Sequence, residues 1–484
     1  MKLKYAYFIF LFVFILRIYL AFQTPFSYDA YLNLDRMQHT AETGELMLFN
    51  DLSFGGNEAL YLPLFYYILA FFIKFFSIEL VAKVLPNLFI SSIVIIIYAI
   101  VKHITENEFS AIFSSLISGF IPVSFIKSLN SVSVESLAIP LIFLSLYFFM
   151  LGKLKINHYI VFMILLMLTS SYSIILVIGF LVYLGLLKIA NLLEDKESTE
   201  IIIFTTLILL WFNFLVYRDL IIDLGFDVIW KNLPFEILSK YFLDINILTI
   251  VFQVGIVPLL CGLFIMYMQI FKDRNKDVYL VMSFALTSLV LLWFKLIKLD
   301  VGLYLFGLVL AILFGVFIKS ALFYFSKTKA YLFKGFFIFG FFLLILFTSI
   351  IPSVTPYIDY PPNDLIQDLK WIRDNTPQNS KVLGNIDEGH IINYIAERKN
   401  VFDNEFYFIE NPNQYMIDIS IIYTTRYMTD SIRLLEEYGV DYILFTDETR
   451  NKYGVDEFNS FDEECFEEVR DSIFQVKCKI GESK

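Results

Sequence analysis

A dense set of polar side chains follows the first long apolar run of this 484-residue chain. Between Pro25 and His39 the sequence contains Asp29, Asn33 and Arg36. Carboxylates and an arginine just past a membrane-length run suit the binding of a cation, a phosphate or a sugar hydroxyl. On a helix these three side chains would share one face and converge on one ligand. A solvated helix lying on a membrane surface has the same pattern, so this alternative stays open.

Two further candidates stand at the ends of other apolar runs. Glu135 lies where one run begins, and the helix dipole favours a glutamate in the first turn of any helix, so a purely structural role is equally compatible. Lys298 lies with Lys295 and Asp300 near the end of another run. Ionisable groups are costly in lipid there and face a cavity or reach for the interface. We therefore expect Lys298 near a polar cavity.

The elements that must position these residues are membrane spans. Hydrophobic residues make up 58% of the chain and charged residues 18%, whereas soluble proteins average about 45–50% and about 25%. Repeated apolar runs predict a multi-pass α-helical membrane protein that crosses the bilayer about eleven times. The predicted spans are 5–22, 80–101, 109–126, 134–151, 157–170, 173–192, 201–218, 246–271, 278–295, 301–320 and 335–351.

The charges between these runs predict the orientation of the chain. The run 61–76 is barely long enough to span, so we predict a juxtamembrane helix in the interface. The basic cluster 272–276 and the N-terminus then face the cytoplasm, as the positive-inside rule requires. The loops 23–79 and 219–245 and the C-terminal part are expected on the outer side of the cell membrane, with 219–245 as a lid over a lipid-linked substrate.

The chain changes from lipid-like to mixed polar character near residue 353. We predict a transmembrane domain over 1–352 and an extracytoplasmic soluble domain over 353–484. Helical spacing over 364–375 and short strand patterns at 381–383 and 441–445 predict an α/β fold for the second domain.

Charge and cysteine content limit the partners. The net charge of -11 argues against nucleic acid, which binds clustered Lys and Arg. Cys465 and Cys478 are compatible with one disulfide that the sequence does not establish. Asp387, Glu388 and His390 are compatible with a metal cluster, but polar residues at a glycine-containing turn are more typical of a solvated loop, so we assign no ligands there.

The stretch 29–36 reads Asp-Ala-Tyr-Leu-Asn-Leu-Asp-Arg, followed by Thr-Gly-Glu-Leu at 43–46 and Tyr-Leu-Pro-Leu at 61–64. This loop resembles the first outer loop of GT-C glycosyltransferases, in particular the catalytic subunit of oligosaccharyltransferase. In that family an aspartate just past the first span is the catalytic carboxylate, and Asp29 matches it. The resemblance also implies a juxtamembrane helix at 61–76.

The stretch Ser133-Val134-Glu135 resembles the Asp-x-Glu type motif of the family's second outer loop. Glu135 matches the second acid, whereas Ser133 replaces the first. The resemblance implies Mn²⁺ or Mg²⁺, with Glu135 as the metal-binding candidate. Because the missing carboxylate removes a hard oxygen ligand, we expect a metal-independent reaction.

The stretch 385–404 falls where the family has its WWDYG signature, but both tryptophans and the tyrosine are missing. Those aromatic residues serve acceptor-sequon recognition in the family. We therefore expect either a different acceptor or a domain that only stabilises the bundle.

The resulting hypothesis is an inverting GT-C glycosyltransferase that moves a sugar or oligosaccharide from a polyprenyl-phosphate or polyprenyl-diphosphate donor to a protein, lipid or polymer acceptor on the outer side. Asp29 is expected to act as general base, while Arg36, Glu135 and Lys298 orient the donor. Related transferases hold a donor phosphate with an arginine near the position of Gly302, which Lys298 is expected to replace. The alternative is a non-catalytic relative, or a transporter or flippase of lipid-linked sugars.

Overall fold

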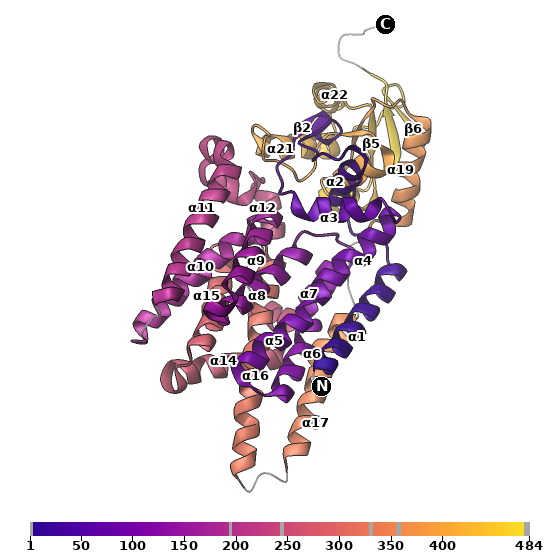
Figure 1. The fold of residues 1–484 in the computed structure, drawn as a ribbon. Helices are drawn as coiled ribbons and strands as arrows, with labels where there is room; N and C mark the ends of the chain where they lie inside the picture. Colours follow the sequence, from indigo (N-terminus) through magenta and orange to yellow (C-terminus); the bar gives the residue numbers. More distant parts are fainter. Residues whose placement is uncertain (1–2, 193–195, 243–245, 329–332, 355–359, 479–484) are drawn as a thin grey trace.

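The chain folds into an apolar helical bundle that carries a mixed sheet at one end (Figure 1). The computed structural model describes residues 3–192, 196–242, 246–328, 333–354 and 360–478. The long bundle elements are α1 (Leu3–Gln23), α4 (Ile78–Ser91), α5 (Ile93–Thr105), α6 (Glu108–Gly119), α7 (Pro122–Ser128), α8 (Glu135–Met150), α9 (Ile156–Thr169), α10 (Ile174–Ile189), α11 (Lys196–Leu224), α13 (Ile247–Val254), α14 (Ile256–Met268), α15 (Lys276–Trp293), α16 (Leu299–Lys327) and α17 (Lys334–Ile345).

The predicted spans fall on helices, but fewer of these helices have membrane length than the sequence suggested. Among the described residues, 8 helices are long and apolar enough to cross a membrane, or 9 if the bent pair α6 and α7 counts as one span. Two predicted runs form the shorter helices α8 and α9, of 16 and 14 residues. A crossing of the hydrocarbon core takes about 20 residues. Apolar content therefore marked where the helices are, but not how long each one is.

Helix α16 is the centre of the bundle. Its most apolar stretch is 94% buried by protein, whereas the corresponding figure for α1 is 22%. Glycines let neighbours approach it closely, since a Cβ on Gly315 would meet the side chains of Ser114 and Val101. Because protein surrounds α16 on nearly all sides, its first residue, Leu299, is held in place by packing. Lys298 directly precedes that residue.

The first loop forms a compact unit beneath the sheet rather than a free surface helix. It contains α2 (Ala30–Thr43), a hairpin of β1 (Phe49–Asn50) and β2 (Asn57–Glu58), and α3 (Leu64–Ile73). With 10 residues, α3 is too short to span, as expected for a juxtamembrane helix. The solvated-helix alternative for α2 is wrong, because its residues Ala30, Leu34 and Met37 are buried.

The C-terminal part is an α/β unit, as predicted. Its sheet has the order β4-β3-β5-β7-β6, with β4, β3 and β5 parallel and β7 and β6 antiparallel. The predicted helix and strands appear as α19 (Asn363–Asn375), β3 (Lys381–Leu383) and β5 (Tyr442–Leu444). The other elements are α20 (Gly389–Ile391), β4 (Lys399–Asn400), α21 (Pro412–Thr424), α22 (Met428–Glu437), α23 (Asp447–Tyr453), β6 (Phe466–Arg470) and β7 (Ile473–Val476). A disulfide joins Cys465 to Cys478.

One hydrophobic core joins the first loop to the sheet. Tyr31 and Leu34 of α2 pack in the same cluster as Leu369 of α19 and Ile391 of α20. A second cluster lies mostly in the C-terminal part, where it includes Ile443 and Phe474, and it also takes in Phe54 of the first loop and Ile237. Burial of these side chains contributes about 1.5–3 kcal/mol each. The first loop belongs to the predicted domain 1–352, yet it shares this core with the C-terminal part. The boundary at residue 352 itself stays a prediction.

The buried acid Glu388 predicts a pH-dependent stability. Its carboxylate accepts hydrogen bonds from Thr446 Oγ1 at 2.6 Å and from the Asn385 amide at 2.8 Å, and burial raises its pKa from 4.5 to about 7. Because the folded state holds the proton more tightly than the unfolded state, stability falls as pH rises from about 4.5 to about 7. At pH values above about 7, the free energy of unfolding is lower by about 3 kcal/mol than it is below pH 4.5.

Glu388→Gln should remove most of this decline, because the amide does not ionise, while its oxygen accepts from the Asn385 backbone N–H and its NH2 group donates to Thr446 Oγ1. Thermal unfolding of the purified protein in detergent between pH 4.5 and 8 measures the effect, and the exposed Glu397→Gln serves as the matched control. An unchanged pH slope in the Glu388 variant would refute the assignment.

Candidate functional site

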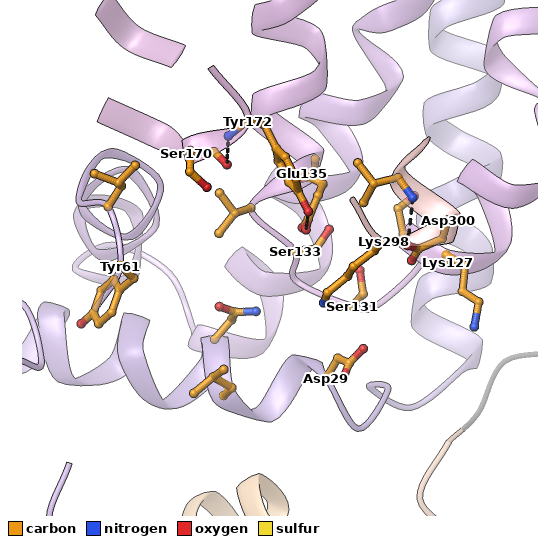
Figure 2. A pocket seen from close by; sticks show the side chains of 18 of the residues that line it. Asp29, Tyr61, Lys127, Ser131, Ser133, Glu135, Ser170, Tyr172, Lys298 and Asp300 are labelled. Atoms are coloured by element: carbon orange, nitrogen blue, oxygen red, sulfur yellow. Dashed lines mark hydrogen bonds between the residues drawn. The ribbon is translucent and has the colours of Figure 1, made fainter. Parts of the chain in front are cut away.

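A cavity of about 260 Å³ lies where the bundle meets the sheet-bearing part of the chain. It brings together residues from segments that are far apart in sequence. Asp29, Arg36, Glu135 and Lys298 all line it. The structure therefore places the four residues selected from the sequence at one site, and Figure 2 shows several of their side chains directed into it.

Asp29 is the N-cap residue of α2, and its exposed carboxylate stands at the mouth of the cavity. Asn33 and Arg36 line the same cavity, so the face predicted from helical spacing exists. The neighbouring Tyr28 donates a 2.7 Å hydrogen bond to Glu448 of α23. This contact holds the start of α2 against the sheet-bearing part.

Asn130 clamps the loop of Asp29 to the segment that leads to Glu135. Its side-chain amide donates to the carbonyl oxygens of Ala21, Thr24 and Pro25 at 2.8, 2.9 and 3.1 Å. The backbone carbonyl of Asn130 accepts a hydrogen bond from the Ser27 backbone N–H at 3.2 Å. The two acidic segments are thereby held in a fixed relation, although 106 residues separate Asp29 from Glu135.

Glu135 is the first residue of α8, so its position also satisfies the helix dipole. The Tyr172 hydroxyl donates to Glu135 Oε1 at 3.2 Å, which orients the carboxylate toward the cavity (Figure 2). Ser133, which stands where the related motif has an acid, lines the same cavity. Glu135 therefore presents one oriented carboxylate from this segment.

Lys298 precedes the first residue of α16 and extends into the cavity (Figure 2). Its ammonium nitrogen lies 4.9 Å from the centre of the Tyr241 ring, a cation–π contact. Asp300 is the second residue of α16, and its carboxylate accepts a hydrogen bond from the Val301 backbone N–H at 2.8 Å. The buried end of α16 thus supplies both a cation and a carboxylate.

Arg36 forms a buried ion pair with Glu405. Its Nη2 lies 2.6 Å from Glu405 Oε2, and the two side chains are 7% and 9% exposed. The guanidinium also stacks over Tyr61, with 4.2 Å between its Cζ and the ring centre. Burial alone would raise the pKa of Glu405, but Arg36 and Lys231 outweigh it and lower that pKa from 4.5 to about 2.

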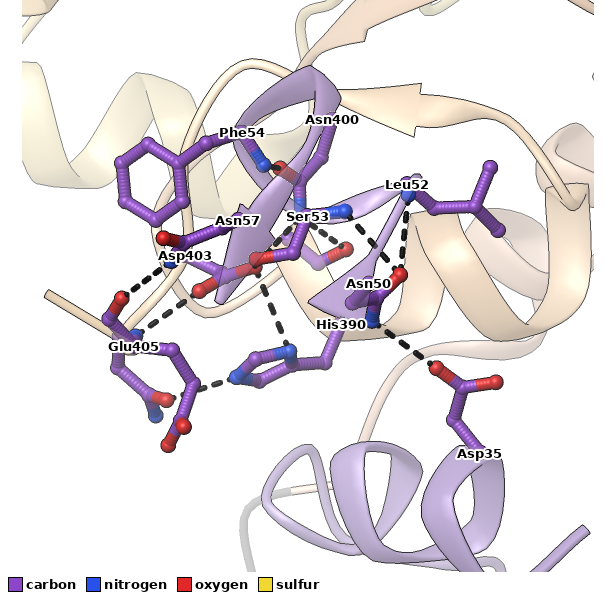
Figure 3. A network of polar contacts seen from close by, with 12 residues as sticks. Asp35, Asn50, Leu52, Ser53, Phe54, Asn57, His390, Asn400, Asp403 and Glu405 are labelled. Carbon is purple, nitrogen blue, oxygen red and sulfur yellow. Dashed lines mark hydrogen bonds and ion pairs between the residues drawn. The ribbon is translucent and has the colours of Figure 1, made fainter. Parts of the chain in front are cut away.

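A polar network behind this pair fixes the segment that carries Glu405 (Figure 3). Asp403 accepts from Ser53 Oγ at 2.7 Å and from Asn400 Nδ2 at 2.9 Å. Asn57 Nδ2 donates to the Glu405 carbonyl at 2.9 Å. His390 Nε2 is hydrogen bonded to Asn404 at 2.7 Å, and both residues line the cavity. The stretch 385–404 therefore forms a wall of the site.

The segment between α11 and α13 contains η4 (Gly225–Trp230) and α12 (Phe235–Tyr241), and its residues Lys231, Leu233 and Tyr241 line one side of the cavity. Asn232 donates to the carbonyls of Phe406 and Ile409, both at 2.9 Å, and Trp230 Nε1 donates to the Lys295 carbonyl at 2.6 Å. Residues 243–245 of the predicted lid lie outside the described part. The rest of this segment is bonded to both halves of the molecule, and its movement as a lid stays a prediction.

Some residues of the site were not selected from the sequence. Glu405, Tyr172 and Tyr241 carry no motif, and each acquires its place through a contact with a distant segment. Lys231 belongs to the segment 219–245 predicted as a lid, and it lies 3.9 Å from Glu405. The burial of Arg36, which requires an acidic partner, appears only in the structure, so the sequence contained no signal for Glu405.

The donor set of the cavity does not fit a tightly held divalent ion. Among the described residues, no group of three His, Cys, Asp or Glu side chains is placed to hold a metal ion. Lys298 lies with the carboxylates, and its positive charge competes with any cation bound by Asp29 and Glu135. Mn²⁺ and Mg²⁺ require several hard oxygen ligands, which these side chains do not supply. The reaction proposed below therefore contains no metal-dependent step.

The fold is that of GT-C oligosaccharyltransferase structures. The apo oligosaccharyltransferase of Archaeoglobus fulgidus aligns with a TM-score of 0.70 at 14% identity, covering 93% of this chain and 70% of that one. The archaeal oligosaccharyltransferase AglB from the same organism, in complex with an inhibitory peptide and a dolichol-phosphate, aligns at 0.66 with 13% identity over 91% and 69%. A complex of the A. fulgidus enzyme with Zn and sulfate aligns at 0.65 with 14% identity over 96% and 71%. No family model and no curated protein matches the sequence.

The Arg36–Glu405 pair makes a stability prediction. Arg36→Met should destabilise the folded state by about 3–5 kcal/mol, because it leaves a buried carboxylate without its partner. Thermal unfolding in detergent, with limited proteolysis of the first loop, measures the loss. The matched control is Arg373→Met, which breaks the exposed pair with Asp374 and should cost less than about 1 kcal/mol. Equal losses in the two variants would contradict the proposed importance of the buried pair.

Proposed function

We propose that this protein is a membrane glycosyltransferase that moves a sugar or oligosaccharide from a polyprenyl-phosphate or polyprenyl-diphosphate donor to an acceptor on the outer side of the membrane. The observation that carries the proposal is the single cavity that collects Asp29, Glu135 and Lys298 at the end of an apolar bundle. A lipid-linked donor can reach such a site with its chain in the bilayer and its sugar in the polar space.

The fold supports the same class of substrate. One similar structure, an archaeal oligosaccharyltransferase, was solved with an inhibitory peptide and a dolichol-phosphate. Another is an oligosaccharyltransferase in the apo form. The alignment with the apo oligosaccharyltransferase covers 93% of this chain, so the likeness of fold is not limited to one part of it. We propose the corresponding topology, with a cytoplasmic N-terminus and an extracytoplasmic sheet.

The proposed reaction is a displacement at the anomeric carbon. Asp29 accepts the proton of the acceptor nucleophile as that nucleophile forms its bond to the anomeric carbon. The bond from this carbon to the phosphate oxygen breaks, and the polyprenyl phosphate or diphosphate leaves with the electron pair. Attack opposite the leaving group inverts the configuration. The exposed carboxylate of Asp29, at the mouth of the cavity, suits a base that must meet an incoming acceptor.

Positive charge is needed where negative charge develops on the leaving phosphate. Lys298 supplies it from inside the cavity, while Glu135, oriented by Tyr172, is suited to a sugar hydroxyl. Arg36 was expected to contact the donor, but its Nη2 is bound to Glu405. We assign Arg36 a positioning role, because its ion pair places the wall that carries Glu405 and Asn404.

The acceptor is proposed by class only. The stretch 385–404 that would meet it lacks the tryptophans and tyrosine of the sequon-binding signature and offers His390 and Asn404 to the cavity instead. Both side chains are hydrogen-bonding groups that suit a hydroxyl or amide on a protein, lipid or polymer acceptor. Whichever of these acceptors is used, we propose that membrane lipids surround the bundle.

Asp29→Asn should lower transfer by at least about 10²-fold, because it removes the base while keeping the size of the side chain. The assay follows labelled sugar from native membrane lipids to product, with the purified protein in detergent. Asp35→Asn is the matched control on the same helix, since Asp35 lies outside the cavity and accepts a hydrogen bond from Asn50. Full transfer by Asp29→Asn, or equal loss in both variants, would refute the role of Asp29.

A further inference from the structure

Lys298 occupies an unusual electrostatic position. Four carboxylates from separate segments act on its ammonium group, namely Asp29, Glu135, Asp300 and Glu405. Burial alone would lower the pKa of Lys298, but these carboxylates outweigh burial and raise it. Figure 2 shows the side chain between Asp29 below and Ser133 and Glu135 above. The lysine is therefore the counter-ion of a carboxylate cluster.

The backbone fixes this counter-ion in place. Lys298 lies immediately before α16, the most deeply buried helix of the bundle, and its ammonium rests 4.9 Å from the Tyr241 ring centre. Tyr241 in turn accepts a hydrogen bond from Asn404 at 3.2 Å. A cation held by both a buried helix end and an aromatic ring stays in the cavity without a bound ligand.

A cluster of carboxylates requires a cation, and two kinds can serve. A divalent ion needs vacant oxygen ligands and space for water, whereas an ammonium group carries its charge on the chain. The two oppose each other, because a positive charge beside the carboxylates repels a second cation. The presence of Lys298 among the acids thus decides between them.

We infer that Lys298 is a tethered substitute for a divalent cation: it keeps metal ions out of the Asp29–Glu135 cluster and supplies the positive charge that faces the donor phosphate. The second part rests on the proposed function. The first part concerns ion binding alone, so it stands or falls independently of transfer.

The inference is specific to Lys298. Two further lysines, Lys127 and Lys231, line the cavity. Lys231 lies 3.9 Å from Glu405 and 5.8 Å from the Tyr407 ring centre. It belongs to the covering segment rather than to the bundle, and Glu405 is the carboxylate that acts on it most strongly, with a smaller effect from Glu135. Removing Lys231 should therefore leave the central cluster neutralised by Lys298, which makes Lys231→Met the matched control.

The test measures Mn²⁺ binding to the purified full-length protein in detergent, by electron paramagnetic resonance of free Mn²⁺ and by isothermal titration calorimetry. We expect Lys298→Met to bind one Mn²⁺ at least about tenfold more tightly than wild type. Lys231→Met should bind like wild type, and the double variant Lys298→Met/Glu135→Gln should lose the gain. Lys298→Gln gives a second, polar variant, and thermal unfolding shows that each variant is folded.

Two results would overturn the inference. Wild type could bind Mn²⁺ as tightly as both Lys298 variants, or the double variant could retain the tighter binding. The transfer assay adds a separate arm, in which Lys298→Met loses activity and Mn²⁺ restores part of it. Absence of transfer in every variant, wild type included, would refute the proposed function, while the Mn²⁺ measurements would still decide whether Lys298 excludes metal.

Discussion

The buried ion pair between Arg36 and Glu405 is the interaction on which the site depends. Two charges removed from water carry a desolvation cost of several kcal/mol each, which only a close and well-bonded partner offsets. The pair meets this requirement with a 2.6 Å contact, the Tyr61 ring and the nearby Lys231. Because neither charge tolerates separation, the first loop and the segment around Glu405 must dock in one register, and the cavity is the space that remains between them.

The charges inside that space come from elements of different rigidity. Lys298 and Asp300 start the buried helix α16, and Glu135 starts α8, whereas Asp29 caps a loop helix at the mouth. Asn130 ties the loop of Asp29 to the segment of Glu135 through carbonyl contacts. Fixed dipoles and charges of this kind stabilise developing charge without reorganising during a reaction. The site is therefore organised before any ligand enters.

The membrane environment explains why the polar groups gather at one end of the bundle. Ionisable side chains within the hydrocarbon core are costly and need partners in protein. Arg17 of α1 illustrates the requirement: it is 2% exposed and donates to Asn87 at 2.9 Å and to Ser128 at 2.7 Å. These bonds join α1, α4 and α7 directly below the loops that carry Asp29 and Asn130. A satisfied arginine within the span thus supports the geometry of the site above it.

Local patterns in the sequence determined the apolar runs, the short helix α3, the α/β character of the C-terminal part and the shared face of Asp29, Asn33 and Arg36. Hydrophobic and helical periodicity depend on neighbours within a few turns, so the chain itself contains this information. Tertiary structure alone decided that Arg36 pairs with Glu405, 369 residues away, and that Lys298 stands among carboxylates from four segments. It also decided the lengths of α8 and α9. Such pairings follow from how distant segments pack, because charge and hydrogen-bonding partners are chosen by proximity in space, which no local spacing records.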